Sequence, residues 1–214
     1  QVLYPRMNED WSPSAELAAA AEAALAASGG EALPSIDLGG YVVLAGSKKG
    51  VSHLLSTLPQ VRIGSVTYPI RLAQHGPYHT HLARSVSDAA SREFADLPFR
   101  RPEVALIDGR GRRHSPWSTD VAALAAYTLG HQITAPYDFT ASVRVALREF
   151  APDQVVLPGP GNTLGGIVGQ VMASEGWSGG HTKEDFAALQ ARPTHIVVRR
   201  GVGRGWVALA ACER

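Results

Sequence analysis

The stretch Ser35-Ile36-Asp37-Leu38-Gly39-Gly40-Tyr41-Val42-Val43-Leu44 decides the fold of the first part of the chain. It holds two runs of β-prone residues, 35–38 and 41–44, separated by two glycines. A Gly-Gly pair tolerates the positive φ angles of a two-residue hairpin turn. The stretch therefore predicts a β-hairpin at the centre of a small sheet.

The segments on either side of this hairpin predict further strands and helices. Residues 2–4 indicate a short strand, and residues 12–30 an alanine-rich helix with Ser12 as N-cap and Pro13 in its first turn. After the hairpin, Ser47 can cap a helix that Pro59 ends, and residues 61–66 alternate like a half-buried strand. This β-α-β-β-α-β order predicts a ferredoxin-like subdomain over residues 1–72.

Residues 73–190 alternate between predicted strands and helices, which is typical of an α/β layer. In the first helix, Leu82, Val86, Ala90 and Phe94 recur every four residues and predict an amphipathic helix. Residues 191–214 are expected to form a C-terminal hairpin extension. The predicted elements are helices at 79–97, 119–129, 138–150 (with Asp138 as N-cap), 163–174 and 183–190, and strands at 104–107, 154–157, 195–198 and 206–209.

The composition excludes several classes of protein. With 45% hydrophobic and 18% charged residues, the 214-residue chain can bury a core. Its formal net charge of +1 lacks the basic excess of non-specific nucleic-acid binders. No apolar run or signal-peptide pattern indicates a membrane or secreted protein. The single cysteine, Cys212, cannot form an internal disulfide, so we expect a cytoplasmic protein, and the start at Gln1 suggests that an upstream part has been removed.

The segment from Gln74 to His81 holds three histidines, which raises the possibility of a zinc site. Gly76-Pro77 breaks any helix that could align His75 with His79, and no carboxylate or cysteine stands nearby in sequence. We therefore expect no metal. Two interpretations remain for His79: a general base for a nucleophile elsewhere, or a structural histidine at a helix start.

Three motifs follow one another along the chain: Gly76-Pro77-Tyr78-His79-Thr80-His81-Leu82, then Leu129-Gly130-His131-Gln132-Ile133-Thr134-Ala135-Pro136-Tyr137, then Gly159-Pro160-Gly161-Asn162-Thr163-Leu164-Gly165-Gly166. Together they resemble the C-terminal half of the malonyl-CoA:acyl carrier protein transacylases. The segment from Asp37 to Gly46 looks like the family's Asn- and Gly-containing segment before Val-Ile-Ser-Gly, although this chain has Leu-Ala-Gly-Ser. The resemblance covers residues 1–175 and implies a ferredoxin-like small subdomain followed by the C-terminal part of an α/β-hydrolase-like large subdomain.

The resemblance assigns roles to several residues. His79 occupies the histidine of the family's Gly-Pro-Phe-His-Ser and would take a proton from a serine. Gln132 stands where the family has the glutamine whose backbone carbonyl orients that histidine. Tyr78 replaces a phenylalanine; an aromatic ring there is associated with malonyl groups, and ordinary packing is the alternative. The residues Gly159, Pro160, Gly161 and Asn162 would shape the wall of the active site; they lack the lysine of a P-loop and the spacing of a dinucleotide fingerprint.

The chain departs from the family because the nucleophile elbow, Gly-His-Ser-Leu-Gly, and the arginine for the malonyl carboxylate belong to an N-terminal half that it lacks. Gly176-Trp177-Ser178-Gly179-Gly180 formally fits G-x-S-x-G. An elbow needs a strand before the serine and a helix after it, whereas Ser178 follows a predicted helix with Gly176 as its C-cap. A hydrolase built around Ser178 is thus a rival interpretation that this geometry disfavours.

The resemblance implies a ping-pong transfer of malonyl from malonyl-CoA to the phosphopantetheine thiol of acyl carrier protein, without a metal or redox cofactor. Its partners would be acyl carrier protein and the missing N-terminal half, and this chain alone would transfer little or nothing. The alternative is a non-catalytic carrier-protein-binding or scaffold fragment. The basic residues near 110–114 and 199–204 fit a solvated surface or attraction of an acidic carrier protein or coenzyme A phosphates.

Overall fold

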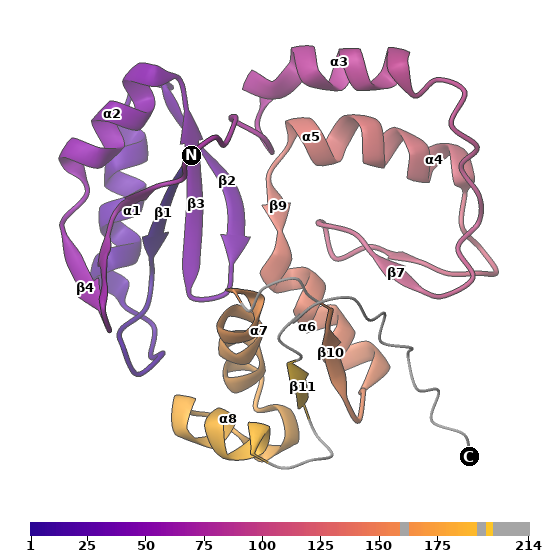
Figure 1. The fold of residues 1–214 in the computed structure, drawn as a ribbon. Helices are drawn as coiled ribbons and strands as arrows, with labels where there is room; N and C mark the ends of the chain where they lie inside the picture. Colours follow the sequence, from indigo (N-terminus) through magenta and orange to yellow (C-terminus); the bar gives the residue numbers. More distant parts are fainter. Residues whose placement is uncertain (159–162, 192–195, 199–214) are drawn as a thin grey trace.

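The computed structural model describes residues 1–158, 163–191 and 196–198 and has a mixed α/β fold (Figure 1). The strands are β1 (Val2–Pro5), β2 (Ala32–Leu38), β3 (Tyr41–Gly46), β4 (Val61–Ile63), β5 (Val66–Tyr68), β6 (Ile70–Arg71), β7 (Leu106–Ile107), β8 (Arg113–His114), β9 (Tyr137–Asp138), β10 (Val155–Leu157) and β11 (Ile196–Val198). The helices are α1 (Ala15–Ala27), α2 (Lys48–Thr57), α3 (Arg84–Glu93), α4 (Val121–Ala126), α5 (Gln132–Thr134), α6 (Phe139–Phe150), α7 (Thr163–Ser174) and α8 (Lys183–Gln190). Short 3-10 turns at His81–Ala83 and Trp177–Gly179 and a π-helical turn at Tyr127–His131 complete these elements.

The predicted hairpin forms the middle of a five-stranded sheet with the order β6-β1-β3-β2-β9. Leu38 of β2 lies opposite Tyr41 of β3, so Gly39 and Gly40 make the two-residue turn. Gly39 has a φ of +65°, the conformation that favours glycine. The strand β1 runs antiparallel to both β3 and β6.

The prediction of one strand over residues 61–66 is wrong. Gly64, with a φ of +59°, turns the chain there, so that β4 and β5 form a separate hairpin in which Ile63 lies opposite Val66. The edge of the main sheet next to β1 is occupied instead by the two-residue strand β6.

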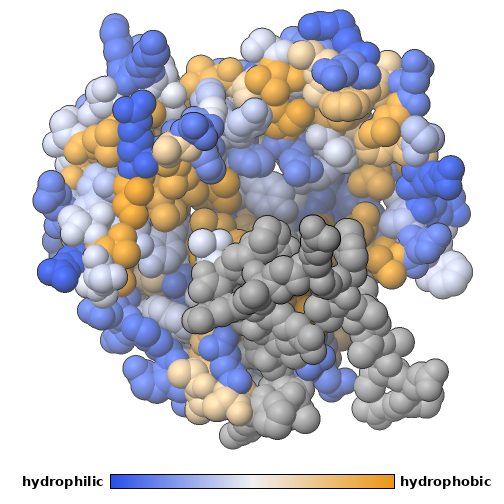
Figure 2. Space-filling view, in the orientation of Figure 1, coloured by the Kyte–Doolittle hydropathy of each residue, from blue (hydrophilic) through white to orange (hydrophobic). Residues whose placement is uncertain are grey.

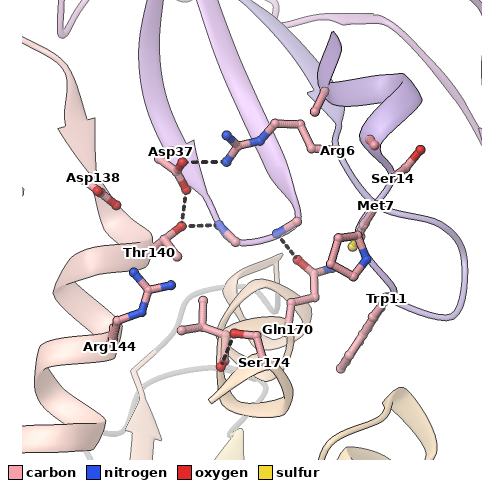
Figure 3. Close-up of a pocket in the computed structure, with 16 residues that line it drawn as sticks. Arg6, Met7, Trp11, Ser14, Asp37, Asp138, Thr140, Arg144, Gln170 and Ser174 are labelled. Atoms are coloured by element: carbon pink, nitrogen blue, oxygen red, sulfur yellow. Dashed lines mark hydrogen bonds and ion pairs between the residues drawn. The ribbon is translucent and has the colours of Figure 1, made fainter. Parts of the chain in front are cut away.

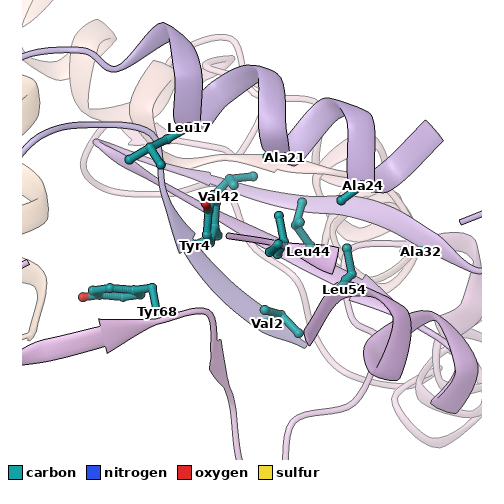
Figure 4. Close-up of a cluster of buried hydrophobic side chains, with 11 residues drawn as sticks. Val2, Tyr4, Leu17, Ala21, Ala24, Ala32, Val42, Leu44, Leu54 and Tyr68 are labelled. Atoms are coloured by element: carbon teal, nitrogen blue, oxygen red, sulfur yellow. The ribbon is translucent and has the colours of Figure 1, made fainter. Parts of the chain in front are cut away.

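The helices α1 and α2 cover one face of the main sheet and enclose its core (Figure 1 and Figure 4). Ser47 caps α2 as predicted, with its hydroxyl accepting from the Gly50 N–H. The helix α1 begins later than predicted, because Ser14 rather than Ser12 is its N-cap. The buried residues of this core are Val2, Tyr4, Leu17, Ala21, Ala24, Ala32, Val42, Leu44, Leu54, Leu58 and Tyr68.

The strand β9 links the sheet to the second part of the chain, because it pairs in parallel with β2, Ile36 lying opposite Tyr137. It leads directly into α6, which Asp138 caps as predicted by accepting from the Ala141 N–H. A second core lies between α6, α7 and α8; its buried residues are Leu147, Val168, Val171, Met172, Phe186 and Leu189.

The helix α3 lies across the helical segment that ends in α5 (Figure 1). Its inward-facing residues are small: Ala83 just before it, and Ser87, whose hydroxyl donates to the Leu129 carbonyl at 2.7 Å. The apolar residues that the sequence places on one face, Leu82, Val86 and Phe94, are 38–44% exposed. In Figure 2, hydrophobic and hydrophilic residues lie side by side over this helix.

The C-terminal elements follow the sequence in part. The bounds of α7 and α8 are those predicted, and β11 pairs in parallel with β10, Ile196 lying opposite Val155. The predicted hairpin partner at 206–209 lies outside the described residues. Among the residues that the structure describes, no helix is both long and apolar enough to cross a membrane.

Candidate active site

His79 has an unusual backbone conformation that four hydrogen bonds hold in place. Its φ is +59°, which costs a non-glycine residue on the order of 1 kcal/mol. Its N–H donates to the Ile133 carbonyl at 2.8 Å. The carbonyl of the preceding residue, Tyr78, accepts from Ser35 Oγ at 2.9 Å and from Gln1 Nε2 at 3.2 Å. Together with the contact of the ring itself with Gln132, these bonds fix the side chain in one direction.

Ser35 belongs to this hydrogen-bonded arrangement, although the sequence did not single it out. It lies in β2, where the register with β3 shifts between Pro34 and Ile36, and it is fully buried. Irregularities of this kind re-aim a side chain and are common beside active sites. Here the shift directs Ser35 to the Tyr78 carbonyl, and the sequence signal was a lone hydroxyl within a β-prone run.

Gln132 and Ile133 contribute carbonyl groups from the end of a helical segment. The last carbonyls of a helix have no partner within it. The residue four positions after Gln132 is Pro136, which has no N–H to donate. The Gln132 carbonyl is therefore free to accept from His79 Nδ1 at 2.6 Å, while the Ile133 carbonyl accepts from the His79 backbone.

This contact determines the tautomer of His79. A carbonyl oxygen only accepts, so Nδ1 must carry the proton and Nε2 keeps its lone pair. Burial lowers the pKa of His79 below its usual value of 6.5, and the bond to the Gln132 carbonyl opposes that shift in part. The imidazole is thus neutral at pH 7, with one nitrogen ready to take a proton. This is the chemistry of a general base.

Tyr137 packs against the imidazole, with 5.4 Å between the ring centroids and an interplanar angle of 59°.

The predicted basic loop has an arrangement that the sequence did not indicate. Asp108 is buried and pairs with Arg110 and His114. His114 is therefore buried with Asp108, whereas Arg110 contacts the carboxylate from the surface and, like Arg112 and Arg113, is exposed.

The other predicted residues that the structure describes do not join His79 and Gln132 through their side chains. The Tyr78 side chain is 43% exposed, and it is the Tyr78 carbonyl that takes part in the site. Residues Gly159, Pro160, Gly161 and Asn162 lie outside the described residues. His75 Nδ1 lies 3.2 Å from Gln1 Oε1, whereas His79 contacts Gln132. Within residues 1–158, 163–191 and 196–198, no group of three or more His, Cys, Asp or Glu side chains could hold a metal ion.

Ser178 lacks the setting of a nucleophile elbow. It lies in a 3-10 turn directly after α7 and has a φ of +52°. Gly176 ends α7 in the left-handed conformation, its N–H donating to the Ala173 carbonyl. The serine is thus preceded by a helix, where an elbow would have a strand.

A pocket of about 510 Å³ lies between the β2–β3 turn, the start of α1, and α6 and α7 (Figure 3). Its polar groups bond to one another: Arg6 pairs with Asp37 at 2.6 Å, Thr140 Oγ1 also donates to Asp37, and Gln170 Oε1 accepts from the Gly40 N–H. Neither His79 nor Gln132 is among the described residues that line it. The bonds of Thr140 and Gln170 connect the end of β2 and its turn to α6 and α7. The polar groups of the pocket therefore serve a structural role.

Comparison with known proteins gives matches to solved structures alone, because no family model and no curated protein matches the chain. An acyl carrier protein S-malonyltransferase from Vibrio cholerae O1 biovar eltor str. N16961 matches with 20% identity and a TM-score of 0.58, over 79% of this chain and 52% of the enzyme. A malonyl-CoA:ACP transacylase from Synechocystis sp. PCC 6803 matches with 15% identity and a TM-score of 0.61, over 88% and 57%. A malonyl-transacylase in complex with its type II PKS acyl-carrier protein matches with 19% identity and a TM-score of 0.58, over 79% and 51%. The chain therefore shares its fold with about half the length of these acyltransferases.

Proposed function

We propose that this chain supplies the histidine of an enzyme that transfers malonyl from malonyl-CoA to the phosphopantetheine thiol of acyl carrier protein. The observation that carries the proposal is the bond from His79 Nδ1 to the Gln132 carbonyl, which leaves Nε2 as a base. The shared fold with malonyl-transacylases supports the same reaction class. In this interpretation residues 1–72, which hold β1 to β6 with α1 and α2, form a ferredoxin-like small subdomain, and residues 73–190 belong to a larger acyltransferase subdomain.

The reaction would proceed in two half-reactions of the same kind. His79 Nε2 takes the proton of a serine hydroxyl as its oxygen bonds to the thioester carbon of malonyl-CoA. The C–S bond then breaks, and the imidazolium returns the proton to the departing thiol. The carrier's thiol attacks the serine ester in the reverse sense, with backbone N–H groups stabilising each oxyanion. The Gln132 carbonyl stabilises the transient imidazolium through Nδ1.

The nucleophilic serine would lie outside these 214 residues, on a segment that packs over the surface beside His79. Tyr78, Leu82 and Val86 are 38–43% exposed next to His79 in sequence. An apolar surface of this kind favours contact with another polypeptide surface. This chain matches only about half the length of the transacylases. A segment like their unmatched half is therefore the candidate for carrying the serine.

Acyl carrier protein is the proposed partner. One matched structure is a malonyl-transacylase in complex with its carrier protein. The exposed Arg112 side chain offers a basic group of the kind that attracts an acidic protein. We place the reaction in the cytoplasm, in agreement with a single cysteine in the whole sequence.

A second candidate is a non-catalytic carrier-protein-binding or scaffold fragment of the same fold. A fragment of this kind needs no nucleophile of its own, and the serine of the G-x-S-x-G pattern, Ser178, is not built as one. This candidate predicts carrier binding without any acyl-enzyme.

The test is to purify the protein from its source with whatever polypeptides accompany it and to incubate it with malonyl-CoA. Intact-mass spectrometry under denaturing conditions should then show a malonyl adduct on an accompanying polypeptide and none on the 214-residue chain. With holo acyl carrier protein added, a His79→Gln variant should lower malonyl transfer by about 10²- to 10⁴-fold. The matched control is His53→Gln, which replaces a histidine on α2 that contacts Ala24 and should leave the rate unchanged.

Two results would contradict the proposal. Malonyl transfer by the pure 214-residue chain would show that the nucleophile lies within it. A preparation that binds carrier protein but gives no adduct on any polypeptide would support the scaffold candidate.

A further inference from the structure

We propose that Asp108 is a positioning residue for His79, which acts through the Gly109 turn and the Tyr137 ring. The inference rests on the proposed function in one respect, that His79 is the base. The physical link between Asp108 and His79 is independent of that function and can be tested separately.

Asp108 organises a tight turn from the inside. Its side chain is 3% exposed and accepts hydrogen bonds from the backbone N–H groups of Arg110 and Arg112 at 2.9 and 3.1 Å. Its second oxygen accepts from Arg110 Nε at 3.0 Å and lies 3.1 Å from His114 Nε2. Burial by itself would raise the pKa of Asp108, but these bonds outweigh it and bring the pKa to about 2. The carboxylate therefore stays charged and paired at every pH at which the protein would work.

The turn that Asp108 closes is bonded to both elements that contact His79. The Gly109 N–H donates to the Tyr127 hydroxyl at 2.7 Å. Tyr127 begins the helical turn that runs directly into Gln132. The Gly109 carbonyl accepts from the Asp138 N–H at 2.7 Å, and Asp138 follows Tyr137 in β9.

Gly109 also supports the Tyr137 ring by direct contact. A Cβ atom at position 109 would lie 2.3 Å from Tyr137 Cδ2, so the ring rests on a backbone that only glycine provides. The ring also packs against the His79 imidazole, with 5.4 Å between the centroids. Tilted aromatic pairs at this separation attract each other and prefer a defined geometry. A displaced turn would therefore move the ring and, with it, the imidazole.

The expected consequence is a misplaced base. A displacement of about 1 Å at a reacting group can lower a rate by about 10²-fold. We expect Asp108→Asn and Gly109→Ala to lower malonyl transfer by about 10- to 100-fold in the complete enzyme, without removing any group that touches substrate.

The deciding measurement is the ¹⁵N spectrum of the His79 imidazole in the 214-residue chain. The native chain should show a single tautomer with the proton on Nδ1. Asp108→Asn and Gly109→Ala should each give a mixture of tautomers or a shifted Nδ1 signal. The matched control is Gly166→Ala, because a Cβ there meets nothing within 4 Å and should leave the signal unchanged.

A second pair of variants covers the case in which a turn variant fails to fold. Tyr137→Phe keeps the ring and should keep the native imidazole spectrum, whereas Tyr137→Ala should lose it. A purely structural role would lower the melting temperature of Asp108→Asn, Gly109→Ala and Tyr137→Ala but leave the imidazole signals of the folded protein unchanged. This outcome would overturn the proposal. If the spectra change as expected but the native protein transfers no malonyl group, the positioning link holds and the proposed function fails.

Discussion

The sheet layer of residues 1–71 and the segment of residues 72–134 differ in how completely they bury their apolar residues. In the sheet layer, Val2, Tyr4, Leu44 and Leu54 are fully buried, and Val66 is the one large hydrophobic residue that is exposed. The exposed large hydrophobic residues of the second segment, among the residues described, are Tyr78, Leu82, Val86, Phe94, Leu97, Val104, Leu106 and Trp117. The layer completes its own core, and the segment presents apolar surface that a further polypeptide could cover.

The difference arises from which residues the helices turn inward. The helix α1 brings Leu17, Ala21 and Ala24 onto the sheet. The helix α3 turns Ser87 inward and leaves Val86 exposed. His79 lies where these two regions meet, because β2 supplies Ser35 and the helical segment supplies Gln132.

The largest effect on stability is expected in the sheet layer. Leu44→Ala should lower the free energy of unfolding by about 3 kcal/mol, because it removes a fully buried side chain and leaves a cavity. Leu82→Ala, the same change at a side chain that is 38% exposed, should cost less than about 1 kcal/mol in this chain. Urea unfolding followed by circular dichroism measures both. Equal losses would show that the second segment is packed as tightly as the first.

A smaller loss is expected at the contact between the two regions. Ser35→Ala should cost about 1 to 3 kcal/mol, because the buried Gln1 amide and the Tyr78 carbonyl each lose a partner. It should also broaden the backbone resonances of His79, whose positive φ the Tyr78 carbonyl helps to fix. Ser52→Ala, at an exposed serine on α2, is the control. A stable Ser35→Ala protein with unchanged His79 resonances would remove Ser35 from the site.

A still smaller effect should appear in the pH dependence. Because burial lowers the pKa of His79 below 6.5, the unfolded chain binds more protons than the native chain between the two pKa values. This histidine's contribution to stability is therefore complete above pH 6.5 and is lost as the pH falls below it. The His79 Cε1 proton should titrate with a midpoint below 6.5 in the native chain and near 6.5 in urea. A native midpoint above 6.5 would mean that the Gln132 carbonyl outweighs burial.

The smallest effect is expected at Ser178. Ser178→Ala should change neither malonyl transfer nor the midpoint of urea unfolding by a measurable amount, since the serine is exposed in a 3-10 turn after α7. Loss of activity in this variant would revive the hydrolase interpretation.

Local signals predicted the parts of the fold that form locally. The Gly39-Gly40 turn, the caps at Ser47 and Asp138 and the bounds of α7 and α8 agree with the structure. The two-residue strands β6 and β9 were missed because they are too short to show a pattern and exist through pairing with distant residues. The charge pattern likewise could not show that Arg110 and His114, within a basic loop, would both pair with Asp108.

The site residues likewise fall into those that were assigned from the sequence and those that were missed. The His79 and Gln132 assignments came from a family resemblance, and the structure brings the two residues into contact. Ser35 and Tyr137 were missed, because nothing in their own neighbourhoods indicates that a strand irregularity and a parallel strand would bring them to His79.

The sequence distance between His79 and Gln132 has a consequence for the order of folding. The β2–β3 hairpin closes within a few residues, whereas the His79–Gln132 bond joins residues 53 positions apart. Local contacts form faster than contacts that must first close a long loop. During synthesis on the ribosome, the sheet layer can therefore assemble while Gln132 is still untranslated. The imidazole would acquire its fixed tautomer only in a late step, so that the sheet layer is folded before the His79–Gln132 contact forms.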